Sequence, residues 1–149
     1  MSKTNSFETD FLKLIFNNDG IANIGDATGL IASTLDGDLW VRLCDTSTCD
    51  DSTLGTEVSY TGYVAGGISV ARTTGGWTVS GNNVTNVAAI TYGYCSGGTD
   101  TGRFFEIWKT QGGTLDTDRL FWGQLTSDIA IATGVTPEFE AGALDVNED

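Results

Sequence analysis

The spacing of apolar residues changes once along this chain, from a helical period to a strand-like one. Between residues 6 and 17, Phe7, Phe11, Leu14 and Ile15 recur at the spacing of one helical face. Ser6 is a suitable N-cap, and the Asn-Asn-Asp-Gly stretch at 17–20 is a stop signal. The pattern predicts one amphipathic helix at the N-terminus.

The rest of the chain is predicted to form short strands. Residues 21–38 are small and Gly-rich, which indicates a loop or a short helical turn around residues 30–32. Short apolar runs bounded by turn residues then follow at 39–44, 68–72, 77–79, 87–92, 104–108, 120–125, 129–132 and 143–146. Such runs favour an all-β sandwich or barrel over alternating βα units. We expect a helix and Gly-rich arm over 1–38 and a β domain over 39–149.

The apolar face of the helix has two possible roles. Packing on the protein's own sheet is the favoured one, because a single amphipathic helix must bury that face. Docking on a neighbouring subunit is the alternative, and it makes Phe7, Phe11, Leu14 and Ile15 the candidate assembly interface.

The charge balance narrows the choice of partners. The chain has 20 Asp and Glu against 7 Lys and Arg, a formal net charge of −13. This disfavours nucleic acid and anionic membranes, whose binding depends on Lys and Arg. A soluble surface is the favoured interpretation, and a basic partner is the alternative. We see no membrane span and no signal peptide in the sequence, so we expect a soluble protein made in the cytosol.

Candidate chemistry is sparse. The chain has no histidine, which removes the usual Ser-His-Asp and Cys-His sets. Glu106, Glu138 and Glu140 are interpreted as outward-facing side chains rather than a glycosidase pair. We therefore predict no enzymatic activity and no cofactor. Four tryptophans lie in strand-like segments and are predicted to be core residues rather than a sugar-binding surface: Trp40, Trp77, Trp108 and Trp122.

Metal binding and disulfide formation are also disfavoured. Zinc would need a fourth ligand beside Cys44, Cys49 and Cys95. The acidic stretches around residues 36–38, 45–51 and 116–118 lack the spacing of a calcium loop and are predicted to be solvated. A Cys44–Cys49 disulfide would close a short loop, but free thiols packed as small apolar groups are favoured in a reducing cytosol.

The order of the segments carries a resemblance. The helix region 7–16, the strand region 39–46 and the segment 62–70 follow one another as the forms "xYLExxLLxxxF", "LYVGLST" and "GGYARVAV" do. Residues 77–92, 105–108 and 119–126 then match "W…AAITF" and "FGIFD…GNLLFYGxLT". The sharpest match is residues 134–146, which correspond to a closing "GDTPxFxAGALxI". In these features the chain resembles a family of short tailed-phage virion proteins that serve as tail fibre or capsid decoration proteins.

The resemblance implies a jelly-roll-like β-sandwich that assembles on the particle as a homo-trimer. We therefore expect a structural virion protein on the capsid surface, a decoration (cement) protein that binds the major capsid protein and itself and stabilises the head lattice. The alternative is a tail fibre or tail adaptor protein involved in host attachment.

Overall fold

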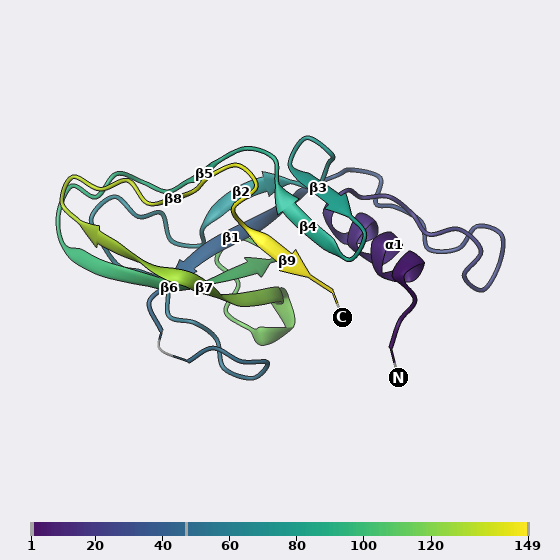
Figure 1. The fold of residues 1–149 in the computed structure, drawn as a ribbon, viewed down its shortest axis with the longest axis horizontal. Coiled ribbons are helices and arrows are strands. Elements are labelled where there is room, and N and C mark those ends of the chain that lie inside the picture. Colours follow the sequence, from purple (N-terminus) through teal and green to yellow (C-terminus); the bar gives the residue numbers. More distant parts are fainter. Residues whose placement is uncertain (1, 47, 149) are drawn as a thin grey trace. The chain divides into compact units, whose positions relative to one another are not determined.

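The computed structural model describes residues 2–46 and 48–148 and has an all-β fold with one N-terminal helix (Figure 1). Its elements are, in order, α1 (Asn5–Phe16), β1 (Asp38–Cys44), β2 (Ile68–Ala71), β3 (Trp77–Ser80), β4 (Asn83–Asn86), β5 (Ile90–Thr91), β6 (Thr99–Trp108), the 3₁₀ turn η1 (Asp116–Asp118), β7 (Arg119–Ala132), β8 (Glu138–Phe139) and β9 (Asp145–Asn147). The strand pairs with a defined register are antiparallel. The expected fold class, an antiparallel β-sandwich preceded by a helix, is confirmed.

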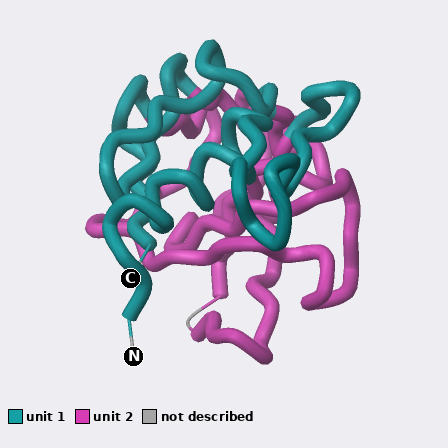
Figure 2. Tube along the Cα trace, turned by 90° about the vertical axis from the view of Figure 1, so that its right-hand side faces the viewer, with its two compact units in different colours: residues 1–38, 70–89, 140–149 teal, residues 39–69, 90–139 magenta. Residues whose placement is uncertain are grey.

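The chain forms two compact units, each made of separate stretches of sequence (Figure 2). Unit 1 comprises residues 1–38, 70–89 and 140–149, and unit 2 comprises residues 39–69 and 90–139. Unit 1 thus contains the whole N-terminal helix and Gly-rich segment together with the middle hairpin and the C-terminal strand.

In unit 1, α1 contacts the sheet β3-β4-β9 through one buried row of side chains. Leu12 and Phe16 are fully buried and Glu8 is nearly so, and the Phe16 and Trp77 rings meet edge to face at 4.9 Å. The helix therefore packs on its own sheet, but with the row 8, 12 and 16 rather than with the face we predicted. Its N-cap is Thr4, whose hydroxyl accepts from the amide of Phe7, so the prediction of Ser6 as the cap is wrong.

Unit 2 contains the sandwich. Its main sheet contains β1, β6 and β7, with residues 68–69 of β2 beside β1, and Val41 and Leu43 of β1 lie opposite Ile107 and Phe105 of β6. The small sheet β5-β8 packs on this face, since the Phe139 ring meets the Phe105 ring edge to face at 6.4 Å.

Several predicted strand boundaries differ in the structure. The predicted strands at 120–125 and 129–132 are one strand, β7, with a bulge where residues 125–128 oppose the single residue Arg103 of β6. The predicted strand at 87–92 shrinks to β5, and β4 and β8 have no counterpart in the prediction. Residues 21–38 contain no helical turn; Ile21 and Leu30 instead form a two-residue bridge.

Candidate functional site

The predicted assembly residues line one side of α1. Phe7 is 38% exposed, while Phe11, Leu14 and Ile15 are half-buried. The Phe7 and Phe11 rings lie 6.5 Å apart, one helical turn from each other. The structure thus brings the four residues together beside the buried row of the helix, where part of each side chain still faces solvent.

The end of α1 is held in place by a single arginine. Arg72 donates from Nε to the carbonyl of Ile15 at 2.7 Å and from Nη2 to the carbonyl of Leu14 at 2.8 Å. A cation at these carbonyls also complements the negative end of the helix dipole. The helix that carries Phe7, Phe11, Leu14 and Ile15 is therefore anchored at its C-terminal end by Arg72.

Unit 2 holds a buried polar centre that the sequence did not indicate. Glu106 was predicted to face outward, and this is wrong, because its side chain is completely buried. One carboxylate oxygen accepts from the Gly55 amide at 2.7 Å and pairs with Arg119 Nη1 at 3.0 Å, and the other accepts from Trp108 Nε1 at 2.9 Å. Glu138 and Glu140 are exposed, as predicted.

Arg119 and Glu106 together fasten the loop at 48–57 onto the sheet. Arg119 donates to the carbonyls of Asp50 and Thr53, and its Nη1 lies 3.0 Å from the Cys49 sulfur. The close approach leaves no room at Gly55, where a Cβ atom would lie 2.8 Å from the Cys44 sulfur. The side chains of this centre are therefore committed to holding the loop.

The chemistry of this centre is that of a structural ion pair. Both oxygens of the Glu106 carboxylate accept hydrogen bonds from the protein, and the side chain has no exposure to solvent. Burial, with the Glu106 carboxylate nearby, raises the pKa of the Cys49 thiol to about 11, and burial raises that of Cys44 further. Both thiols are therefore protonated at neutral pH, and the thiolate is the reactive form of cysteine.

A shallow groove of about 530 Å³ lies on unit 2, walled mainly by glycines and threonines. Arg42 forms part of its lining and is held by the carbonyl of Gly113 at 2.7 Å, by Glu57 at 3.4 Å and by the Trp108 ring at 3.7 Å. The guanidinium is thus stacked and paired within the protein, and Arg42 is itself only 5% exposed.

The tryptophan prediction holds in part. Trp77 and Trp108 are fully buried and Trp40 is half-buried. Trp122 is 38% exposed, so its assignment to the core is wrong. Its ring lies beside Phe104 at 6.5 Å, and its Nε1 donates to Asp51 at 3.2 Å. The Trp122 ring therefore belongs to the attachment of the loop at 48–57.

The cysteines and acidic loops have structural roles. All three cysteines are free and buried. Asp50 accepts from the backbone amides of Ser52 and Thr53 at 2.8 Å each, and these hydrogen bonds lower its pKa. Within residues 2–46 and 48–148, no group of three or more acidic or cysteine side chains is placed to hold a metal ion. In the same part of the chain, no helix is both long and apolar enough to cross a membrane.

The closing segment of the chain is locked by a buried asparagine that the sequence analysis missed. Asn86 is 1% exposed and donates to the carbonyls of Ala88 and Glu140 at 2.8 Å each, while its side-chain oxygen accepts from the Leu144 amide at 2.9 Å. Gly142 has a φ of 74° in the turn that Asn86 holds, a conformation that favours glycine. The Ala-Gly-Ala-Leu stretch at 141–144 is therefore a tightly specified turn.

Comparison with known proteins adds no relative: no family model and no curated protein matches this chain.

Proposed function

We propose that this protein is a structural component of a tailed-phage particle, a capsid decoration (cement) protein on the outer surface of the head. The observation that carries the proposal is the ordered series of sequence segments, ending in residues 134–146, that resembles the family of short phage virion proteins. The buried side chains described above support it, because their polar groups are engaged in holding loops and turns rather than arranged around a substrate.

The mechanism follows from many weak contacts. Each copy would bind the major capsid protein beneath it and pack against other copies, in the jelly-roll-like homo-trimer that the resemblance implies. Repetition over a symmetric lattice makes such contacts strong in sum, and the shell would resist the pressure of the packaged genome. The half-exposed row Phe7, Phe11, Leu14 and Ile15 is the proposed contact between copies.

The first test is the number of copies per particle. Quantitative mass spectrometry of purified virions, referenced to the major capsid protein, is expected to give a ratio near one copy per capsid subunit. Shells that lack the protein are expected to gain resistance to heat when it is added. No gain in shell stability would contradict the proposal.

The alternative is a tail fibre or tail adaptor protein that takes part in host attachment. It shares the same resemblance, and copy number separates the two functions. A few copies per virion would place the protein in the tail and make binding to the host surface the next measurement.

A further inference from the structure

The segment between α1 and β1, residues 19–37, forms an ordered loop that we call the arm. It is drawn in Figure 1 as the long loop beyond α1, and both belong to unit 1. Ile21 and Leu30 exchange two backbone hydrogen bonds, of 2.9 and 2.8 Å. Asp26 accepts from the amides of Thr28 and Gly29, at 2.8 and 3.0 Å, and closes the tip.

The base of the arm is fixed by one side chain. Asn18 accepts from the Ser33 amide at 2.8 Å, donates to the Ser33 carbonyl at 2.9 Å and donates to Asp36 at 3.1 Å. Asn18 itself has a φ of 57°. The arm is thus held by its own hydrogen bonds, and a partner would meet it largely pre-organised.

The arm exposes several large apolar side chains to solvent. Of the ten large apolar side chains exposed in the described chain, four lie on it: Ile24, Leu30, Ile31 and Leu35. Ile31 and Leu35 are the two most exposed of the ten, at 74% and 81%. Large apolar side chains exposed together on one loop indicate an interaction surface.

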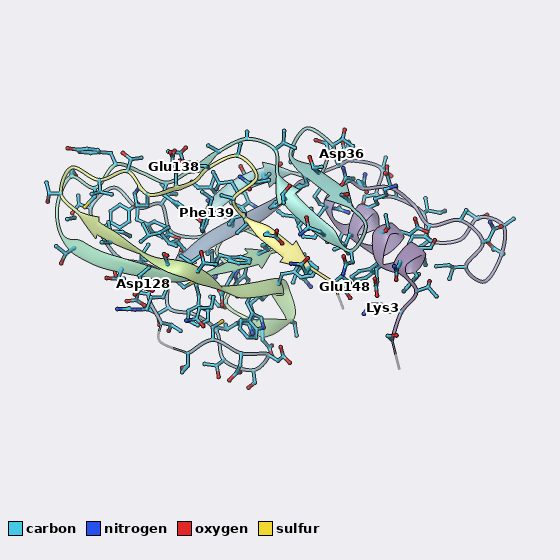
Figure 3. All side chains as sticks on the ribbon, in the orientation of Figure 1. Lys3, Asp36, Asp128, Glu138, Phe139 and Glu148 are labelled. Atoms are coloured by element: carbon cyan, nitrogen blue, oxygen red, sulfur yellow. The ribbon has the colours of Figure 1, made fainter. Side chains whose placement is uncertain are left out.

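Charge indicates which kind of partner covers the arm. The arm carries Asp19, Asp26 and Asp36 and has no Lys or Arg. A second copy is a poor match for this acidic arm, because each copy carries only 7 Lys and Arg. Moreover, five of its seven cations already form ion pairs, among them Lys3 with Glu148, which Figure 3 shows side by side. Another cation, Arg72, binds the carbonyls of α1 and of Asp36.

We propose that the arm inserts Ile31 and Leu35 into an apolar cleft bordered by Lys or Arg on a different protein, the major capsid protein of the shell; this rests on the proposed function. The apolar side chains would supply the buried area. The aspartates beside them would select a basic rim, which makes the contact sensitive to salt.

The test uses the full chain and empty shells assembled from the major capsid protein alone, with binding measured by co-sedimentation. The double variant Ile31→Ser, Leu35→Ser is expected to bind about tenfold or more weakly, since two apolar side chains no longer leave water. The matched control is Val64→Ser, Leu115→Ser, which removes two exposed apolar side chains from unit 2 and is expected to bind as wild type. Wild-type binding is also expected to weaken as NaCl is raised.

The outcomes separate this inference from the proposed function. Wild-type protein that fails to bind shells overturns both. Wild-type protein that binds, with the arm variant binding equally well, overturns the arm alone. Sedimentation velocity on the chain without shells supplies the remaining test: self-association that the arm variant abolishes would assign the arm to a second copy and overturn the partner named here. The thermal midpoint of the arm variant is expected to match wild type, because both side chains are exposed.

Discussion

The Glu106 side chain is buried and helps to hold the fold together, although the sequence around it predicts an outward-facing residue. It lies in β6 between Phe105 and Ile107, in an alternating run that predicts one buried face and one face exposed to solvent. In the structure both faces of the sheet are covered, one by β5-β8 and the other by the loop at 48–57. A carboxylate on the second face is therefore buried, and it accepts from Arg119 and from three other donors. These are the Gly55 amide, Trp108 Nε1 and the Cys49 thiol.

Replacing Glu106 is expected to destabilise the protein strongly. Glu106→Gln leaves the Arg119 guanidinium buried without its counter-charge, and breaking a buried pair from one side costs about 3–5 kcal/mol. Urea unfolding followed by tryptophan fluorescence measures the change. The control is Glu138→Gln, at an exposed glutamate in β8, which is expected to leave the midpoint unchanged. Equal midpoints for Glu106→Gln and wild type would show that the pair adds nothing to stability.

The raised pKa of the Cys49 thiol predicts that the protein loses stability at alkaline pH. Its pKa is raised to about 11 in the folded protein by burial and by Glu106, while a cysteine in an unfolded chain has a pKa of about 8.5. Between these values the unfolded chain loses the proton and the folded protein keeps it, so the free energy of unfolding falls as pH rises. The contribution is fully present below about pH 8.5.

The variant Cys49→Ala isolates this effect from the other groups that titrate in alkali. The difference in unfolding free energy between wild type and Cys49→Ala is expected to be constant from pH 6 to 8 and then to shift against wild type toward about pH 11. Chemical unfolding at a series of pH values measures it. A difference that stays constant up to pH 11 would contradict the buried, protonated thiol.

At the scale of elements, the sequence predicts the helix and the strands that have an apolar pattern of their own. It does not predict the strands that are defined only by pairing with a distant part of the chain. The helix and strands β1, β2, β3 and β6 have apolar runs of their own. β4 reads Asn-Val-Thr-Asn and β8 has two residues, so each is identified only by the strand with which it pairs. In β7, the Thr-Ser-Asp stretch at 126–128 resembles a turn, but pairing with β6 on both sides turns it into a bulge.

The start of α1 offers a test of which residue caps the helix. Thr4→Ala removes the hydroxyl that accepts from the Phe7 amide, and losing such a cap costs about 0.5–2 kcal/mol. Ser6→Ala lies inside the helix, where alanine is the better helix former, and is expected to be neutral or slightly stabilising. Thermal unfolding of both variants measures the difference, and a larger loss for Ser6→Ala would move the cap back to Ser6.

At the scale of the whole molecule, two effects oppose each other. Repulsion between negatively charged copies acts against the attraction between their exposed apolar side chains. The chain exposes Ile31, Leu35 and the Phe7 row, yet it carries a net charge of −13 with a pI of about 4.1. Long-range repulsion between copies is expected to keep free protein dispersed until a basic partner binds the arm and holds copies close enough for the Phe7 row to meet. Neither the charge nor the apolar pattern of the sequence predicts this balance between repulsion and attraction, because the exposure of the arm is seen only in the folded protein.

Light scattering can measure this balance directly. At pH 7 and low salt the second virial coefficient is expected to be positive, because like charges repel over roughly 10 Å or more. It is expected to fall as NaCl is added and to become negative near pH 4, where carboxylates are protonated and the net charge approaches zero. The variant Ile31→Ser, Leu35→Ser should remain closer to zero at pH 4, since the arm supplies much of the exposed apolar surface. A coefficient already negative at pH 7 and low salt would show that attraction between copies outweighs their charge, and would favour a second copy over a basic shell protein as the partner of the arm.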